Sequence, residues 1–201
     1  MKVLPVGADA VLLELDSAAE VAAVHAELLR RREELGDVTD IVPAARTVLL
    51  DGVAPAVAAR IASWTIPELT AQEGPEVTVP VRFDGPDLTD VAALWGVAPA
   101  EVPEVVCGTG FRVAFCGFAP GFGYLTGLPE RYHVPRRATP RTAVPAGSLA
   151  LAGEYAGVYP RSSPGGWQLI GTADAVLWDP RRDPAALFAP GVRVRFTEVA
   201  G

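Results

Sequence analysis

The sequence predicts an α+β protein with a small N-terminal α/β domain over residues 1–75 and a mostly β domain over residues 76–201. Two observations carry this prediction. Helix-period and strand-period patterns alternate in the first part, whereas the second part consists of short apolar runs separated by Gly and Pro. The 20 Gly and 19 Pro follow no strict period, so they indicate many turns and not a collagen-like repeat.

The N-terminal domain is predicted to have the element order β-β-α-β-β-α. Strands are expected at residues 3–6 and 10–15, followed by a helix that Asp16 or Ser17 caps, with Glu20 nearby. Its apolar positions follow helical spacing as far as Gly36. Strands at 38–42 and 46–50 come next, and a second helix begins near Pro55, a favoured first-turn residue, and runs to residue 64. This order predicts an antiparallel sheet with helices on one face.

A linker is expected over residues 65–75, where the charge balance also changes. Acidic residues outnumber basic ones two to one over residues 1–75, and the two are nearly equal over the rest of the chain. The second domain then opens with a strand at 77–83 and short helices at 87–95 and 99–106. Further strands are expected at 111–118, 148–152, 157–159, 167–170, 175–178 and 192–196. Such spacing predicts a barrel or a sandwich.

Composition excludes several classes of function. The net charge of −7 argues against nucleic-acid binding, and no stretch reaches the ~18 apolar residues of a membrane span. Two cysteines are too few for a disulfide framework or a four-Cys zinc site, and we expect no metal site and a cytoplasmic location. Lys2 is the single lysine, so the chain has no P-loop lysine and no lysine suited to carry biotin. Any ATP or biotin would therefore be held by another chain.

Four loops combine Gly and Pro with aromatic and Arg residues: 115–124, 135–141, 144–148 and 159–167. Glycine lets backbone approach a ligand closely, and the planar fork of arginine matches a carboxylate or phosphate. Residues 131–161 carry five Arg and one acid. This local excess indicates either an anion site or surface arginines paired with acids of the other domain. No catalytic triad is evident, because Ser148 lacks the context of a nucleophile elbow, so the catalytic residues stay unassigned.

These motifs resemble the family of 5-oxoprolinase B subunits, which is also called allophanate hydrolase subunit 1 and includes the kinase inhibitor KipI. The resemblance rests on Gly117-Phe118-Ala119-Pro120-Gly121-Phe122, the run 135–141, the run 144–148 and the run 159–167. It implies a small N-terminal α/β domain, which we expect to be ferredoxin-like, and a C-terminal cyclophilin-like β-barrel. The family resembled here forms one half of the carboxyltransferase domain of urea carboxylase.

The resemblance also implies an activity and partners. The family's C subunit, itself cyclophilin-like, is expected to pair with this chain, and the A subunit to join them. Together they would couple ATP hydrolysis to opening of the 5-oxoproline lactam, giving glutamate. Two alternatives stay open: a KipI-like module that binds a kinase without turnover, and a carboxyltransferase component of the urea carboxylase or allophanate hydrolase type, served by biotin on another chain.

For the enzyme hypothesis, substrate binding is assigned to eight residues. Arg137 and Arg141 would bind an anion, whereas Tyr124, Tyr159 and Trp167 would wall the pocket and Gly121, Gly165 and Gly166 would shape it. The chain departs from the family pattern in two motifs. Val106 and Cys107 stand where relatives commonly have His-Thr, and Thr172 stands where they commonly have Arg.

Overall fold

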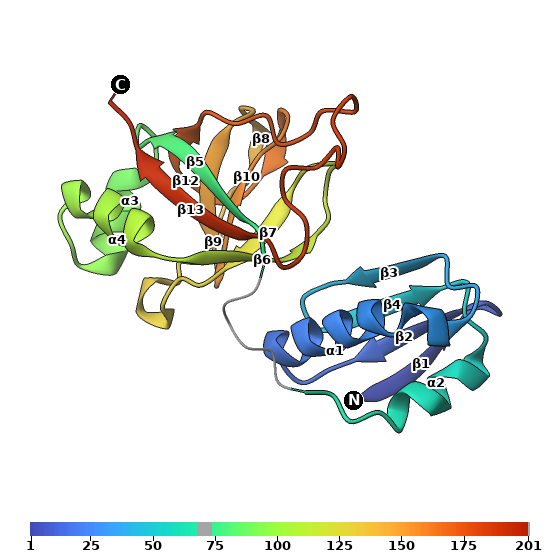
Figure 1. Cartoon of the computed structure of the whole chain (residues 1–201). Coiled ribbons are helices and arrows are strands. Elements are labelled where there is room, and N and C mark those ends of the chain that lie inside the picture. Colours follow the sequence, from blue (N-terminus) through green and yellow to red (C-terminus); the bar gives the residue numbers. More distant parts are fainter. Residues whose placement is uncertain (68–73, 201) are drawn as a thin grey trace. The chain divides into compact units, whose positions relative to one another are not determined.

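A computed structural model describes residues 1–67 and 74–200 of the chain. The chain divides into two compact units, and the second unit begins at Gly74 (Figure 1). Of the linker predicted over residues 65–75, residues 68–73 lie outside the described residues. Each unit has a hydrophobic core of its own.

The first unit is a four-stranded antiparallel sheet with two helices. Its elements are β1 (Lys2–Val6), β2 (Ala10–Glu14), α1 (Ala18–Arg30), a 3-10 turn (Arg32–Leu35), β3 (Asp40–Pro43), β4 (Thr47–Asp51) and α2 (Pro55–Ala62). The strand order β1-β2-β4-β3 confirms the predicted antiparallel sheet and element order. This order becomes the ferredoxin-like βαββαβ only when the first strand is moved to the end, so the ferredoxin-like detail is not confirmed.

The start of α1 confirms the predicted cap. The Ser17 hydroxyl accepts a hydrogen bond from the Glu20 N–H at 3.1 Å, and the Glu20 carboxylate accepts one from the Asp16 N–H at 3.0 Å. These bonds satisfy backbone donors that a helix N-terminus would otherwise leave unpaired. A cap of this kind stabilises a helix by about 1 kcal/mol.

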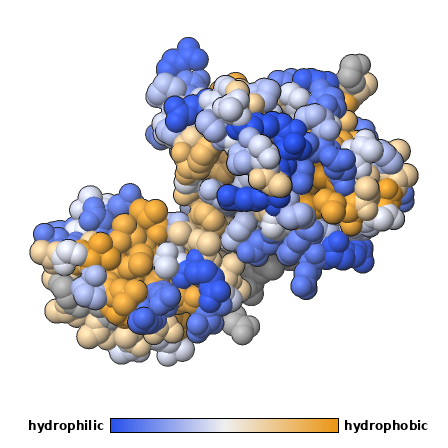
Figure 2. Space-filling model, turned by 180° about the vertical axis from the view of Figure 1, so that it is seen from behind, coloured by the Kyte–Doolittle hydropathy of each residue, from blue (hydrophilic) through white to orange (hydrophobic). Residues whose placement is uncertain are grey.

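Both helices of the first unit pack on one face of its sheet. Val24 and Leu28 of α1 and Ile61 of α2 share a buried cluster with inward-facing strand residues such as Leu13 and Leu50. The other face carries a row of directly paired aliphatic residues, namely Leu4, Leu12, Leu49 and Val42. In Figure 1 α1 lies in front of the sheet, and the view from behind in Figure 2 shows hydrophobic residues gathered on this unit.

The second unit is built around a closed barrel, which confirms the prediction of a barrel or sandwich. Its strands follow the order β10-β7-β6-β13-β5-β12-β9 and close between β9 and β10. All neighbours are antiparallel except β13 and β5, which are parallel. The barrel strands are β5 (Glu76–Arg82), β6 (Phe111–Cys116), β7 (Gly123–Thr126), β9 (Ser148–Ala152), β10 (Tyr155–Val158), β12 (Gln168–Ala173) and β13 (Arg193–Glu198).

Two short helices pack on the barrel and complete its core. They are α3 (Leu88–Trp95) and α4 (Val102–Gly108), and a 3-10 turn (Pro99–Glu101) leads into α4. Val91 and Val106 are fully buried in the barrel core. No single helix in the described part of the chain is long and apolar enough to cross a membrane. The bent pair α3 and 99–108, angled by 92°, passes that test on length and composition only.

The predicted and observed strands differ at four places. Residues 175–178 form no strand, because Val176 and Trp178 are largely exposed and Trp178 makes only an isolated bridge to Ala186. Three short strands were not predicted: β7, β8 (Arg141–Val144) and β11 (Ser163–Gly165), the last two forming a separate two-stranded sheet. Proline and glycine within β11 and the brevity of β8 hide the strand periodicity.

Candidate functional site

The loops with unusual composition meet on the second unit. Residues 117–122 connect β6 to β7, and residues 135–140 lead into β8, which pairs with β11. The Arg137 N–H donates to the Gly166 carbonyl at 2.8 Å, so the 135–141 run lies against the segment that joins β11 to β12. Backbone pairing thus brings together segments that are about 30 residues apart in the sequence.

The three aromatic residues assigned to the site surround one ring. Phe122, which the sequence assignment omitted, lies with its ring centre 5.0 Å from that of Tyr124, 5.4 Å from Tyr159 and 5.6 Å from Trp167. Tyr159 and Trp167 are 2 % and 5 % exposed. The aromatic cluster consists of five rings, those of Phe118, Phe122, Tyr124, Tyr159 and Trp167. Edge-to-face packing of this kind makes a rigid interior beneath the loops.

Phe118 is the exposed member of the aromatic cluster. Its ring is 58 % exposed and lies 5.3 Å from Phe122 and 6.1 Å from Tyr159. Its φ of 66° is the only positive φ of a non-glycine residue in the described ranges. Such backbone costs about 1 kcal/mol or more, so the surrounding loop has to hold this residue in place. The strained position lies inside the Gly-Phe-Ala-Pro-Gly-Phe motif.

The assigned glycines differ in the space around them. Gly121 has a φ of +84°, and a Cβ there would lie 2.9 Å from the Trp178 Cβ. A Cβ on Gly165 would lie 2.4 Å from the Tyr159 hydroxyl oxygen, whereas one on Gly166 would meet nothing nearer than Pro140 at 3.7 Å. Gly121 and Gly165 therefore permit close packing, and Gly166 does not need to be glycine for steric reasons.

This difference gives a matched pair of substitutions. We expect Gly165→Ala to lower the free energy of unfolding by about 1–3 kcal/mol, because buried Tyr159 cannot move away. Gly166→Ala serves as the control and is expected to cost less than about 1 kcal/mol. Denaturant unfolding followed by tryptophan fluorescence measures both. Equal stability of the two variants would show that Tyr159 does not fix Gly165.

Arg137 and Arg141 both bind a buried carboxylate, that of Asp87. Arg137 Nη1 and Arg141 Nη2 donate to Asp87 Oδ1 at 2.6 and 2.7 Å, and the Leu169 N–H donates to Oδ2 at 2.7 Å. Asp87 is 2 % exposed. It precedes α3 as its N-cap residue, yet its side chain makes no capping bond. The acid that pairs with these arginines thus belongs to the same unit, not to the other domain.

The protonation of Asp87 follows from these contacts. Burial alone would raise its pKa, but the hydrogen bonds from Arg141 and the Leu169 N–H and the charges of both arginines outweigh burial and lower the pKa below its ordinary value. Asp87 is therefore ionised at neutral pH. Two guanidinium groups around one carboxylate leave a local charge of +1. The site keeps an attraction for an anion, but a weaker one than two free arginines would have.

Val106 and Thr172, which depart from the family pattern, are each accommodated by their surroundings. Val106, at the expected His position, is fully buried in the barrel core as part of α4. The Thr172 hydroxyl, at the expected Arg position on β12, donates to the Asp84 carboxylate at 2.8 Å. Both residues therefore fit their places without the side chains that relatives commonly have.

A pocket of about 460 Å³ lies beside the Gly-Phe-Ala-Pro-Gly-Phe loop. Residues 116–121 line one side, without Phe118, and Trp178 and Phe188 line the other. Cys116 is one of these lining residues. Burial raises the pKa of its thiol to about 11, so it is not a thiolate nucleophile at neutral pH. No group of three or more His, Cys, Asp and Glu side chains within residues 1–67 and 74–200 could hold a metal ion.

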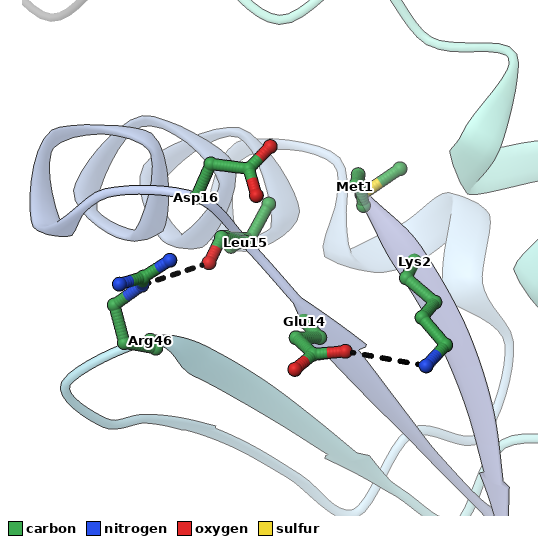
Figure 3. Close-up of a pocket in the computed structure, with 6 residues that line it drawn as sticks. All are labelled: Met1, Lys2, Glu14, Leu15, Asp16 and Arg46. Atoms are coloured by element: carbon green, nitrogen blue, oxygen red, sulfur yellow. Dashed lines mark hydrogen bonds and ion pairs between the residues drawn. The ribbon is translucent and has the colours of Figure 1, made fainter.

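A second pocket, of about 580 Å³, lies on the first unit (Figure 3). Lys2 on β1 and Glu14 on β2 line it and form an ion pair, with 3.6 Å between Lys2 Nζ and Glu14 Oε2. Arg46 donates from Nε to the Leu15 carbonyl at 3.0 Å. These charged groups are already satisfied by the protein, and the pocket contains none of the sequence motifs. The loops of the second unit are therefore the stronger candidate site.

Comparisons with known proteins show the family to which the chain is related. The family model for the carboxyltransferase domain, subdomain C and D, matches residues 1–188. The chain is 39 % identical over 202 residues to the 5-oxoprolinase B subunit of Escherichia coli O157:H7, an alignment that covers 95 % of this chain and 93 % of that protein. It is 41 % identical over 136 residues to the 5-oxoprolinase B subunit of Haemophilus influenzae, covering 66 % of this chain and 64 % of the relative.

Solved structures show the same fold. A crystal structure of TTHA0988 superposes with a TM-score of 0.80 at 32 % identity, covering 96 % of this chain and 40 % of that one. Urea carboxylase of Kluyveromyces lactis superposes with a TM-score of 0.73 at 18 % identity, covering 100 % of this chain and 23 % of that one. This chain thus corresponds to about two fifths of the first protein and about a quarter of the second.

Proposed function

The chain belongs to the family of the carboxyltransferase domain, subdomain C and D, and from this premise we propose that it is the B subunit of an ATP-dependent 5-oxoprolinase. The observation that carries the proposal is the similarity to the E. coli 5-oxoprolinase B subunit over nearly the full length of both chains. The reaction would open the lactam ring of 5-oxoproline by adding water across the amide bond, and the product would be glutamate.

The chain is proposed to act with partners and not alone. Chains similar to the A and C subunits would complete the enzyme, and one of them would hold ATP, because this chain has no P-loop lysine. ATP hydrolysis supplies the driving force when the nucleotide is bound there. Such a complex would work in the cytoplasm, where ATP is made available. The closed barrel supports a cyclophilin-like fold, and the first unit supports a ferredoxin-like unit with one strand relocated.

The proposed role of this chain is to bind and orient the substrate. Arg137 and Arg141, fixed by Asp87, would attract the carboxylate of 5-oxoproline through their remaining charge. The aromatic cluster would give the binding loops a rigid base, which matters because small displacements of a reacting group cost rate. Lactam opening also needs donors for the developing oxyanion, which backbone N–H groups of the glycine loops are suited to supply.

The alternatives receive less support from these findings. The likeness to urea carboxylase is at 18 % identity and concerns the fold alone, so it carries no biotin-dependent activity to this chain. The buried position of Val106 explains how the chain tolerates a valine there, and it favours neither turnover nor its absence. The proposed function therefore stays with lactam hydrolysis.

Reconstitution tests the proposal. The A and C subunits from the same source are combined with this chain, and ATP hydrolysis that depends on 5-oxoproline is measured along with glutamate release. We expect both only when all three chains are present. The matched control is the same mixture without this chain. A stable three-chain complex without 5-oxoproline-dependent ATP hydrolysis would contradict the proposed function.

A further inference from the structure

Four buried polar atoms near the arginine pair have no hydrogen-bond partner. They are Arg137 Nε, Arg141 Nη1, Ser163 Oγ and Gln168 Oε1, and they are the buried unpaired side-chain atoms of the described residues. All four belong to two segments that touch. Arg137 donates its backbone N–H to Gly166, and Arg141 pairs with Gly165 across β8 and β11. Buried polar atoms are paired in roughly 90 % of cases or more, so four on two neighbouring segments indicate a ligand or ordered water.

Gln168 is the most informative of the four residues. Its side chain is only 8 % exposed. The side-chain Nε2 donates to the Pro135 carbonyl at 3.2 Å, and this bond fixes the orientation of the amide. The unpaired atom is therefore the carbonyl oxygen, which can only accept a hydrogen bond. Leaving such an atom buried and unpaired costs about 1–3 kcal/mol.

The unpaired atoms define the chemistry of a complementary ligand. Arg137 and Arg141 offer N–H donors beside a net positive charge, which suits a carboxylate. Ser163, on the strand that pairs with β8, adds a hydroxyl donor. Gln168 Oε1 requires a hydrogen-bond donor on the ligand, close to that carboxylate. In 5-oxoproline the carbon that bears the carboxylate is bonded directly to the lactam nitrogen, so its N–H donor lies next to its carboxylate.

We propose that Gln168 is a specificity-determining residue whose side-chain oxygen accepts the lactam N–H of 5-oxoproline, while Arg137, Arg141 and Ser163 hold the adjacent carboxylate. This inference rests on the proposed function and adds to it the residues that distinguish a lactam from other ring carboxylates. A site built to accept an N–H rejects an analogue that lacks it, because a buried acceptor is then left unpaired.

The test uses the reconstituted complex with Gln168→Met, which removes the polar end while nearly keeping the shape. The probes are 5-oxoproline as substrate and its lactone analogue, with ring oxygen in place of N–H, as competitive inhibitor. We expect the wild-type complex to bind the lactam at least about ten-fold more tightly than the lactone. Gln168→Met is expected to raise KM for 5-oxoproline about ten-fold and to bind lactam and lactone equally. Ser162→Ala, at an exposed position beside Ser163, is the control.

Thermal unfolding separates this proposal from a structural role. Gln168→Met removes the unpaired oxygen but also the Nε2 hydrogen bond to the Pro135 carbonyl, so its melting temperature is expected to fall by no more than about 5 °C. A loss of lactam preference in a variant that is still folded at the assay temperature would not come from misfolding. A Gln168→Met complex that keeps the wild-type preference for lactam over lactone would overturn the inference while leaving the proposed function intact. A wild-type complex without 5-oxoproline-dependent turnover would overturn both.

Discussion

Asp87→Ala is expected to lower the free energy of unfolding of the second unit by about 3–5 kcal/mol. The substitution removes the acceptor that Arg137, Arg141 and the Leu169 N–H share. Two half-buried guanidinium groups are then left close together with no counter-charge, which is the costly way to break a buried ion pair. The loop before β8 and the start of β12 also lose the atom that joins them.

Denaturant unfolding of the full chain measures this effect through Trp95, Trp167 and Trp178, which all lie in the second unit. Asp90→Ala is the matched control, because Asp90 is an exposed carboxylate in the first turn of the same helix, α3. We expect that control to cost less than about 1 kcal/mol. A loss of similar size in both variants would mean that helix electrostatics, not the arginine contacts, account for the role of Asp87.

The same carboxylate makes stability depend on pH in the acid range. Its pKa is lower in the folded chain than the value of about 3.9 for an unfolded chain. Its contribution is therefore complete above about pH 4 and is lost as the pH falls through the lower, folded-state pKa. The stability difference between wild type and Asp87→Asn should be constant from pH 7 to 5 and shrink below pH 4. A difference that grows on acidification would have the wrong sign for this explanation.

Local sequence patterns predicted the elements but not their pairing. The cap at Ser17, the first-turn proline of α2 and the strand at Ser148–Ala152 are each set by neighbouring residues, and all three are confirmed. Residues 175–178 show the limit of this reasoning. Their apolar pattern resembles a strand, but a strand needs a partner, and four residues carry no information about which segment lies beside them.

Asp87 shows the same limit for the candidate site. Its sequence position before a helix predicts a capping role, and it lies 50 residues before Arg137. Only the closed barrel brings β12 and the loop before β8 to its carboxylate. Composition did indicate the arginine cluster, but it could not say that the nearest acid is part of the same unit. No sequence pattern marks Gln168. It is a candidate because its side-chain oxygen is buried without a hydrogen-bond partner, and only the packing of the folded chain produces that situation.

Removing the whole ion-pair set should abolish 5-oxoproline-dependent turnover while preserving the fold. We expect the triple variant Asp87→Asn, Arg137→Met and Arg141→Met to fold as a stable second unit, because replacing a buried ion pair by neutral groups of similar volume is often neutral for stability. Loss of two charge-assisted hydrogen bonds to the substrate, each about 1.5–3 kcal/mol, predicts a fall in kcat/KM of at least about 100-fold.

The triple variant separates binding from structure because it leaves no buried charge unpaired, unlike either single arginine substitution. Melting temperature and assembly with the A and C subunits are measured beside turnover. Arg161→Met is the control, since Arg161 is an exposed member of the same arginine-rich stretch. It should keep wild-type turnover. If the triple variant folds, assembles and still turns over 5-oxoproline at the wild-type rate, Arg137 and Arg141 only stabilise the loops through Asp87, and substrate recognition has to be assigned to other residues.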